Sequence, residues 1–190
     1  MARRTRAAME ETRASLLATA RKAFAETGYA EASMDELTAQ AGLTRGALYH
    51  HFGDKKGLLA AVVAQIDGEM DERLEAISAK ATSPWQALNE RCNAYLRMAL
   101  EPEIQRIVLR DARAVLGGAT AEGEQHCIAS LRGLIEQMGI EQAEALARLI
   151  YGSLAEAAFW IAQEDDGTAR LAQAQAALAV LLAGIQRQAT

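Results

Sequence analysis

The sequence predicts an all-α fold of about nine helices, and two observations support this prediction. Alanine and leucine dominate the 190 residues while β-branched residues are sparse, which favours helices over sheets. Apolar residues recur at intervals of three and four along most of the chain, as they do on one face of a helix. With 51% hydrophobic and 24% charged residues, the chain has the composition of an ordered globular protein with a sizeable core.

Three helices are expected in the N-terminal part of the chain. Apolar residues at helical spacing place the first over residues 12–27. Ser33-Met34-Asp35-Glu36 forms a capping box that opens a short second helix, which ends at Gly42. Thr44 is a good N-cap for a third helix, from Arg45 to His51. Two short helices joined by a glycine-containing turn indicate a helix-turn-helix, whose second helix enters a groove of DNA.

The residues of the third helix fit a DNA-contacting role. Gly46 lowers helix stability by about 1 kcal/mol relative to alanine, a loss that close approach of the backbone to DNA would explain. Arg45 carries a fork of donors that matches guanine in the major groove. The groups suited to phosphates are the side chains of Tyr49, His50, Lys55 and Lys56 and the free amides behind Thr44. Taken singly, each has a structural explanation: crowding at Gly46, core packing of Tyr49, and a solvated face for the lysines.

The charge distribution agrees with a DNA-facing N-terminal end. Residues 1–56 carry nine Lys and Arg against seven Asp and Glu, a balance of +2, whereas the rest of the chain carries −7. A net-acidic protein can still bind nucleic acid when its basic groups gather at one end. The basic start resembles the head of a signal peptide, but Glu10 and Glu11 interrupt any apolar segment behind it, so a cytoplasmic location is expected.

The segment from Ser33 to Leu59 resembles the DNA-binding segment of the TetR family of bacterial transcriptional regulators. The matching residues are Ala41-Gly42, Gly46, Leu48-Tyr49-His50, Phe52, Lys55 and Leu58. The resemblance implies that Thr44, Arg45, Gly46, Tyr49 and His50 face DNA, that Ser33 and Lys55 contact phosphates, and that Leu48 and Phe52 hold the recognition helix. It also implies that the basic start, with Arg3, Arg4 and Arg6, forms an arm along the minor groove.

Two departures from the family pattern bear on which operator is read. Gly53-Asp54-Lys55-Lys56 stands where the family often has Pro-Ser-Lys-Glu, so the reciprocal glutamate of that cap is lost. Gly57 weakens the same first turn. Ala47 replaces a frequent threonine, which exchanges a hydroxyl contact for a methyl group that can contact thymine.

Residues 1–54 are therefore expected to form a DNA-binding domain, and residues 55–190 a helical body for ligand binding and dimerisation. Start signals such as Ser83-Pro84 and stop signals such as Gly117-Gly118 divide the body into six helices. These are expected from residue 55 to about 80, from Pro84 to about 100, from Pro102 to Gly117, and over about 121–138, 141–163 and 168–187.

The last two helices are apolar on more than one face, and such helices must be buried on more than one face. A terminal helix has few neighbours in its own chain, so we expect a homodimer, and the resemblance implies a four-helix interface. The alternative is burial within one chain. A two-fold dimer would present two recognition helices about one DNA turn apart and read a roughly palindromic site. The expected interface residues are Leu146, Ile150, Leu154, Ala158, Leu171, Ala174, Leu178, Leu181 and Ile185.

The resemblance also implies a small-molecule pocket in the body, whose occupancy changes the spacing of the two DNA-binding heads by a population shift. The candidate apolar lining residues are Trp85, Tyr95, Met98, Tyr151, Phe159 and Trp160, and the candidate polar contacts are Arg110, Asp111 and His126. Aromatic residues of a helical bundle also serve as ordinary core, and Arg110 with Asp111 could form a surface pair.

The resemblance thus implies a ligand-responsive repressor that binds a double-stranded DNA operator and is released by a small-molecule effector. The alternatives are a transcriptional activator and a helical small-molecule-binding protein without sequence-specific DNA binding. An enzyme is not expected, because the chain has no phosphate loop, Gly-x-Ser-x-Gly or His-Glu-x-x-His motif.

No cofactor, metal site or membrane contact is expected either. Consecutive His50 and His51 diverge by about 100° on a helix and do not converge on a metal. Cys92 and Cys127 are too few for a disulfide scaffold and are expected to be small buried apolar residues. No run approaches the roughly 18 uncharged apolar residues of a membrane span.

Overall fold

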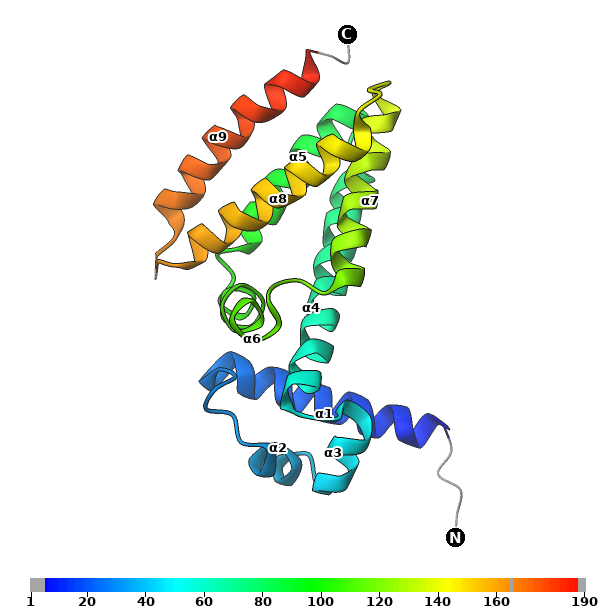
Figure 1. The fold of residues 1–190 in the computed structure, drawn as a ribbon, viewed down its shortest axis with the longest axis vertical. Coiled ribbons are helices and arrows are strands. Elements are labelled where there is room, and N and C mark those ends of the chain that lie inside the picture. The colour runs from blue at the N-terminus through cyan, green and yellow to red at the C-terminus, as the bar shows by residue number, and fades with distance from the viewer. Residues whose placement is uncertain (1–5, 165, 188–190) are drawn as a thin grey trace.

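Helices build the part of the chain that the structure describes, residues 6–164 and 166–187, and no strand occurs there (Figure 1). The structure is a computed structural model, and it confirms the all-α prediction. Three N-terminal helices form a head at one end, and a long fourth helix leads from the head into a larger helical body (Figure 1). Arg3 and Arg4, predicted to form a minor-groove arm, lie outside the described residues.

The head consists of α1 (Arg6–Thr27), α2 (Met34–Gln40) and α3 (Arg45–Phe52). The two predicted caps are present: the amide of Glu36 donates to the Ser33 hydroxyl at 3.5 Å, and that of Ala47 to the Thr44 hydroxyl at 3.3 Å. The helices share a core in which Phe24, Leu37 and Leu48 are at most 2% exposed. The first helix begins earlier than predicted, because its first turns carry no apolar stripe to signal them.

The body contains α4 (Lys55–Ser78), α5 (Pro84–Met98), α7 (Ala121–Gln137), α8 (Ala143–Ala162) and α9 (Thr168–Gln186), in close agreement with the predicted ranges. The helix predicted from Pro102 to Gly117 has a different form in the structure. It is a π-helical segment, η1 (Ile104–Ala112), that continues into a short α6 (Arg113–Leu116) and ends at Gly117, whose φ is +93°. A π-helix differs from an α-helix in its hydrogen-bond partners, which leave little trace in residue types.

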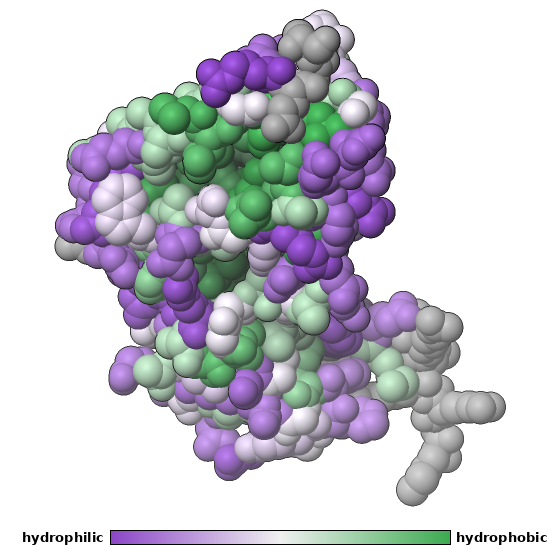
Figure 2. Space-filling view, turned by 45° about the horizontal axis from the view of Figure 1, so that its top comes forward, coloured by the Kyte–Doolittle hydropathy of each residue, from purple (hydrophilic) through white to green (hydrophobic). Residues whose placement is uncertain are grey.

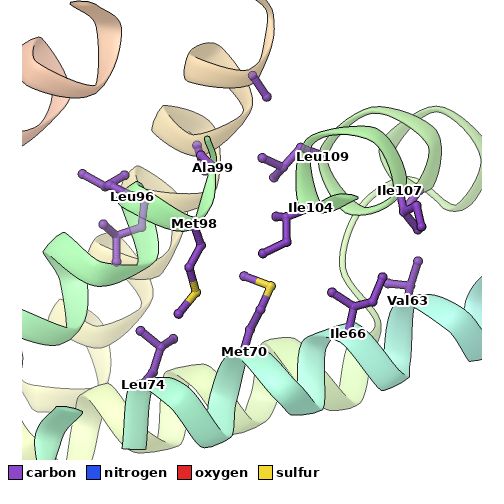
Figure 3. Packing of buried hydrophobic residues seen from close by; sticks show 14 of the residues in the cluster. Val63, Ile66, Met70, Leu74, Leu96, Met98, Ala99, Ile104, Ile107 and Leu109 are labelled. Carbon is purple, nitrogen blue, oxygen red and sulfur yellow. The ribbon is translucent and has the colours of Figure 1, made fainter. Parts of the chain in front are cut away.

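The body core forms where α4 meets the end of α5 and η1 (Figure 3). From α4, Met70 and Leu74 point toward Met98 of α5 and Ile104 of η1 (Figure 3), and all four side chains are at most 6% exposed. The segment η1 packs directly on α4 and on α8.

Three polar contacts join η1 and the residue before it to the end of α1 and the loop that follows α1. Arg21 donates to Glu103 just before η1 at 2.7 Å and also to Glu69 of α4 at 2.6 Å. Arg106 donates to the carbonyl of Thr27 at 2.8 Å, and the amide of Tyr29 donates to Asp111 at 2.8 Å. The guanidinium of Arg106 occupies the space beside Gly28 where a Cβ would stand, 2.3 Å away. The head is therefore attached to η1 as well as to α4.

By length and composition, α8 and α9 are apolar enough to cross a membrane. Within the structure, 33% of the most apolar stretch of α8 and 28% of that of α9 are buried. The sequence-based prediction that no run approaches a membrane span considered only runs without charged residues, so it did not include these two helices. Both helices pack against the body, α8 on α7 and α9 on α5 and α8. Their remaining apolar surface is described with the candidate sites below.

Candidate DNA-binding surface and effector cavity

Helix α3 lies in the head with one face buried and the other open to solvent. Leu48 is fully buried, whereas Thr44, Arg45, Gly46, Tyr49 and His50 are exposed and Ala47 is partly buried. A Cβ at Gly46 would find only the Thr44 hydroxyl nearby, at 3.9 Å. Crowding inside the head therefore does not explain Gly46, and its backbone remains accessible from outside.

The Arg45 guanidinium lies along the exposed face of α3. It is 3.1 Å from the Asp35 carboxylate and 5.9 Å from the centre of the Tyr49 ring. The Arg45 and Asp35 side chains are 60% and 68% exposed, so their ion pair contributes little to stability. Arg45 can therefore leave Asp35 and bind a base edge with little loss of folding stability.

The two lysines at the start of α4 have different surroundings. The Lys55 ammonium donates to the carbonyl of Ala30 at 3.1 Å and lies 4.6 Å from the centre of the Tyr29 ring. Lys55 is partly buried, so part of its role is to tie α4 to the loop after α1, whereas Lys56 is exposed. The structure thus distinguishes a lysine that supports the head from one directed to solvent.

The turn between α3 and α4 explains Gly57 differently from the sequence. Asp54 caps α4 by accepting from the Gly57 amide at 2.7 Å. A Cβ on Gly57 would lie 2.0 Å from the carbonyl oxygen of Phe52, the last residue of α3. Gly57 is therefore required by the close approach of two backbone segments, and its role is not limited to weakening the first turn.

A second candidate site lies within the body. An inner chamber of about 50 Å³ is lined by Asp67, Met70, Asp71, Leu74, Tyr95, Val108, Ala119, Gly123, Cys127 and Tyr151. An outer hollow of about 450 Å³ shares Asp67, Asp71 and Gly123 with that chamber and adds residues that include Glu72, Glu75, Glu122 and His126. The shared residues make one cavity, narrow inside and wide at the surface.

Carboxylates dominate the electrostatics of this cavity. The Oδ2 atom of Asp67 is buried and has no hydrogen-bond partner. Burial, and secondly the charge of Asp71, raises the pKa of Asp67 to about 6. Burial also raises the pKa of Asp71, against the opposing charges of His126 and of Arg91, which lies 3.6 Å away. Burial thus disfavours the charged form of both carboxylates.

The structure brings three of the predicted pocket residues to this cavity and places the others elsewhere. Tyr95 and Tyr151 line the inner chamber, and His126 stands at the outer hollow with its Nε2 3.2 Å from Glu75. Arg110 donates to the carbonyl of Ala162 at 2.6 and 2.9 Å and so holds the end of α8.

The remaining candidates lie outside this cavity. Arg113 lies 3.7 Å from the centre of the Phe159 ring, and Arg170 lies 5.0 Å from that of Trp160. Trp85 packs against the core, and Met98 is 3% exposed within it. Sequence reasoning missed Asp67 and Asp71, although two carboxylates one turn apart on an otherwise apolar helix face were the available signal.

The outer face of α8 and α9 is apolar and hollowed (Figure 2). A groove of about 400 Å³ there is lined by residues that include Leu96, Ala157, Trp160, Ala177 and Leu181. Leu149, Val180 and Leu181 are 68%, 75% and 59% exposed. Exposed apolar patches of this kind mark interaction surfaces.

The predicted interface residues differ in how far their own chain covers them. Ile150, Leu154, Ala158, Leu178 and Ile185 are each at most 7% exposed, because they hold α8 and α9 on their own body. Leu146, Leu171 and Ala174 are partly buried, and Leu181 is exposed. The groove lining nevertheless includes Leu154, Ala174, Leu178 and Leu181. The most exposed apolar side chains of these helices are Leu149, Val180 and Leu181, which we call the α8–α9 face.

Comparison with known proteins identifies the family. A family model described as "Bacterial regulatory proteins, tetR family" matches residues 16–62, which include α2 and α3. A second, described as "Tetracyclin repressor-like, C-terminal domain", matches residues 85–185, more than half of the chain. The chain belongs to the TetR family.

Similar TetR-family proteins include regulators from several bacteria. The transcriptional repressor BepR of Brucella suis is 32% identical over 107 residues, which cover 56% of this chain and 51% of BepR. The regulator SrpR of Pseudomonas putida is 44% identical over 64 residues, 34% of this chain and 30% of SrpR. These matches thus span about half or less of the curated relatives.

Solved structures match over nearly the whole chain. A TetR-family regulator from Pectobacterium atrosepticum is 68% identical, with a TM-score of 0.89, over 96% of this chain and 97% of that one. The regulator FadR from Bacillus subtilis, solved with stearoyl-CoA, has a TM-score of 0.68 at 18% identity over 90% of this chain and 98% of FadR, a likeness that shows the fold alone.

Proposed function

We propose that this protein is a transcriptional repressor that binds a palindromic DNA operator as a homodimer and is released by a small-molecule effector. The observation that carries the proposal is the exposed edge of α3, with Thr44, Arg45 and Gly46 open to solvent above a buried Leu48. Membership of the TetR family and similarity to the repressor BepR support the DNA-binding and repressor roles.

In this proposal, α3 enters the major groove with its N-terminal end leading. Arg45 reads a base edge, and the accessible backbone at Gly46 allows close approach. Ala47 contacts a thymine methyl group, and Tyr49, His50, Ser33 and Lys56 contact the phosphate backbone. Lys55 supports the same surface from its place beside Tyr29. Residues 1–54 and 55–190 then act as the DNA-binding and the ligand-binding domains, joined by α4.

The α8–α9 face supports the proposed dimer. Three large apolar side chains exposed by more than half are unfavourable in a lone subunit, and a second copy would cover them. An isologous contact of α8 and α9 with their counterparts would set the separation of the two recognition helices.

The connection between cavity and head runs through η1. Val108 of η1 lines the inner chamber, while Arg106 and Asp111 of the same segment bind the end of α1 and the loop after it. A ligand that moves η1 relative to α4 therefore acts on both attachments of the head. An effector that binds one head spacing more tightly shifts the population toward it and lowers operator affinity.

The central experiment is selection of binding sites from random duplex DNA, followed by titration at several salt concentrations. We expect a motif of two inverted half-sites about one helical turn apart, with an affinity that falls steeply as salt rises. A reporter placed behind the selected site would show lower expression with the protein present. Failure to recover any motif would leave a helical ligand-binding protein, and raised expression would indicate an activator.

Substitutions at the head separate base reading from phosphate binding. Arg45→Ala should lower affinity for the selected site by about 1–3 kcal/mol and relax the preference at the base it reads. Lys56→Ala should weaken binding to specific and random duplexes alike and reduce the salt slope by about one. Both side chains are exposed, so neither change should alter the unfolding midpoint. Competition binding against the two kinds of duplex measures the difference.

A charge on the α8–α9 face tests the dimer. Leu181→Glu should convert the protein to monomers, because an apolar contact would have to bury an unpaired carboxylate. Gln163→Glu introduces the same charge at an exposed site just beyond α8 and should leave the dimer intact. Sedimentation velocity measures the assembly. A Leu181→Glu protein that remains dimeric would place the interface elsewhere.

A further inference from the structure

We propose that the cavity described above takes an organic cation that carries a small apolar group, with its positive charge against Asp67 and Asp71. The cation would be the effector, a role that rests on the proposed function. The inference concerns the chemistry of the ligand, which the walls of the cavity determine.

The first argument is the unpaired carboxylate. Asp67 Oδ2 is buried without a hydrogen-bond partner, and such an oxygen destabilises the protein unless a donor or a cation meets it. Asp67 lines both the inner chamber and the outer hollow, so a ligand at their junction reaches it. The space is kept by Gly123, where a Cβ would lie 3.2 Å from that oxygen.

The second argument is the balance of charge around the cavity. The described residues that line it include five carboxylates and a single basic group, His126: the carboxylates are those of Asp67, Asp71, Glu72, Glu75 and Glu122. His126 lies 3.2 Å from Glu75. Arg91 is 3% exposed and lies 3.6 Å from Asp71. Its charge therefore offsets that of Asp71 and leaves the charge of Asp67 uncompensated. The negative charge of the outer hollow attracts a cation and repels an anion.

The third argument is the inner wall. Tyr95, Tyr151 and Met70 present two aromatic rings and a thioether behind the carboxylates. Such groups favour an organic cation through apolar and cation–π contacts. A bare metal ion fits less well, since the described residues contain no group of three or more His, Cys, Asp or Glu side chains placed to hold one.

The size of the chamber links this ligand to regulation. About 50 Å³ is too small for a ring, since apolar cavities that hold benzene measure about 150 Å³. A ligand whose apolar group enters must therefore separate Met70 of α4 from Val108 of η1. Because η1 holds the end of α1, this separation is transmitted to the head.

Three matched probes test the inference by calorimetry: phenethylammonium, 2-phenylethanol and 3-phenylpropanoate share a ring and a two-carbon chain but differ in charge. At pH 7.5 we expect phenethylammonium to bind about tenfold or more tightly than the alcohol, with the carboxylate weakest. The full-length protein is used throughout. Equal binding of all three, or tightest binding of 3-phenylpropanoate, would overturn the inference.

Variants assign the effect to the carboxylate. Asp67→Asn, which keeps the side-chain shape, should reduce the affinity for phenethylammonium to that for 2-phenylethanol. Glu141→Gln removes the same charge from an exposed site outside the cavity and should change affinity less than about twofold. An unchanged affinity of Asp67→Asn for phenethylammonium, with the protein folded by circular dichroism, would also overturn the inference.

Operator binding distinguishes this inference from the proposed function. If the protein selects an operator and phenethylammonium releases it, both stand. If an operator is selected and only the anionic probe binds, the cation inference alone fails. If phenethylammonium binds and Asp67→Asn abolishes the preference but no DNA motif is recovered, the ligand chemistry stands and the proposed function fails.

Discussion

Replacing Gly57 by alanine should destabilise the protein by about 3 kcal/mol and abolish operator binding. The added Cβ would lie 2.0 Å from the carbonyl oxygen and 3.2 Å from the carbonyl carbon of Phe52. Both are backbone atoms, so the clash can be relieved only by moving the end of α3 away from α4. Urea denaturation followed by circular dichroism measures the loss, and titration of the selected duplex measures binding.

The matched control is Gly46, the helical glycine of α3. Gly46→Ala has open space, since the nearest heavy atom to its Cβ would be 3.9 Å away. It should therefore raise stability by up to about 1 kcal/mol, the helix propensity of alanine over glycine. If the Gly46 backbone approaches DNA, the same change should weaken operator binding. A Gly57→Ala protein as stable as the unsubstituted chain would contradict the close approach seen in the α3–α4 turn.

Replacing Asp67 by asparagine should raise stability at pH 8 by up to about 3 kcal/mol, with the gain shrinking as the pH falls. Burial raises the pKa of Asp67 from 3.8 to about 6 in the folded protein. The folded state therefore binds the proton more tightly than the unfolded state, and the unsubstituted protein loses stability as the pH rises between these two values. Asparagine has no charge to bury, so it avoids that loss above pH 6.

Urea denaturation at pH 4, 5, 6 and 8 checks this dependence. Glu141→Gln serves as control, because that side chain is exposed and its removal should leave the pH profile unchanged. A difference between Asp67→Asn and the unsubstituted protein that stays constant with pH would mean that the carboxylate is not the group responsible. Residues of this kind, unfavourable for folding, are common where a protein binds a ligand.

Much of the fold follows from local signals in the sequence. Ser33, Thr44, Asp54 and Ser83 are N-caps that fix where helices begin, and each is observed with its hydrogen bond. The π-helical form of η1 could not be predicted in this way. That segment packs between α4 and α8, and the same residues would suit an ordinary helix.

The candidate sites differ in how far they could be predicted. The recognition surface lies on consecutive residues of one short helix, so spacing alone places Thr44, Arg45 and Gly46 together at its start. The candidate effector cavity draws on five different helical segments, and no local pattern brings Asp67 beside Gly123 or Tyr151. The exposed side of α8 and α9 could not be predicted, because alanine and leucine occur on several sides of each helix and only packing shows which side is covered.

The sequence alone determined an all-α fold, most of the helix limits and the helix-turn-helix segment, since capping, helix periodicity and the recognition motif act over a few neighbouring residues. Only the tertiary structure decided that Lys55 braces the head, that Gly57 must be a glycine, and that Asp67 stands uncompensated in a cavity. Those features depend on contacts between segments that are far apart in the sequence. Burial then determines the energetic effect of each charge and of each missing side chain.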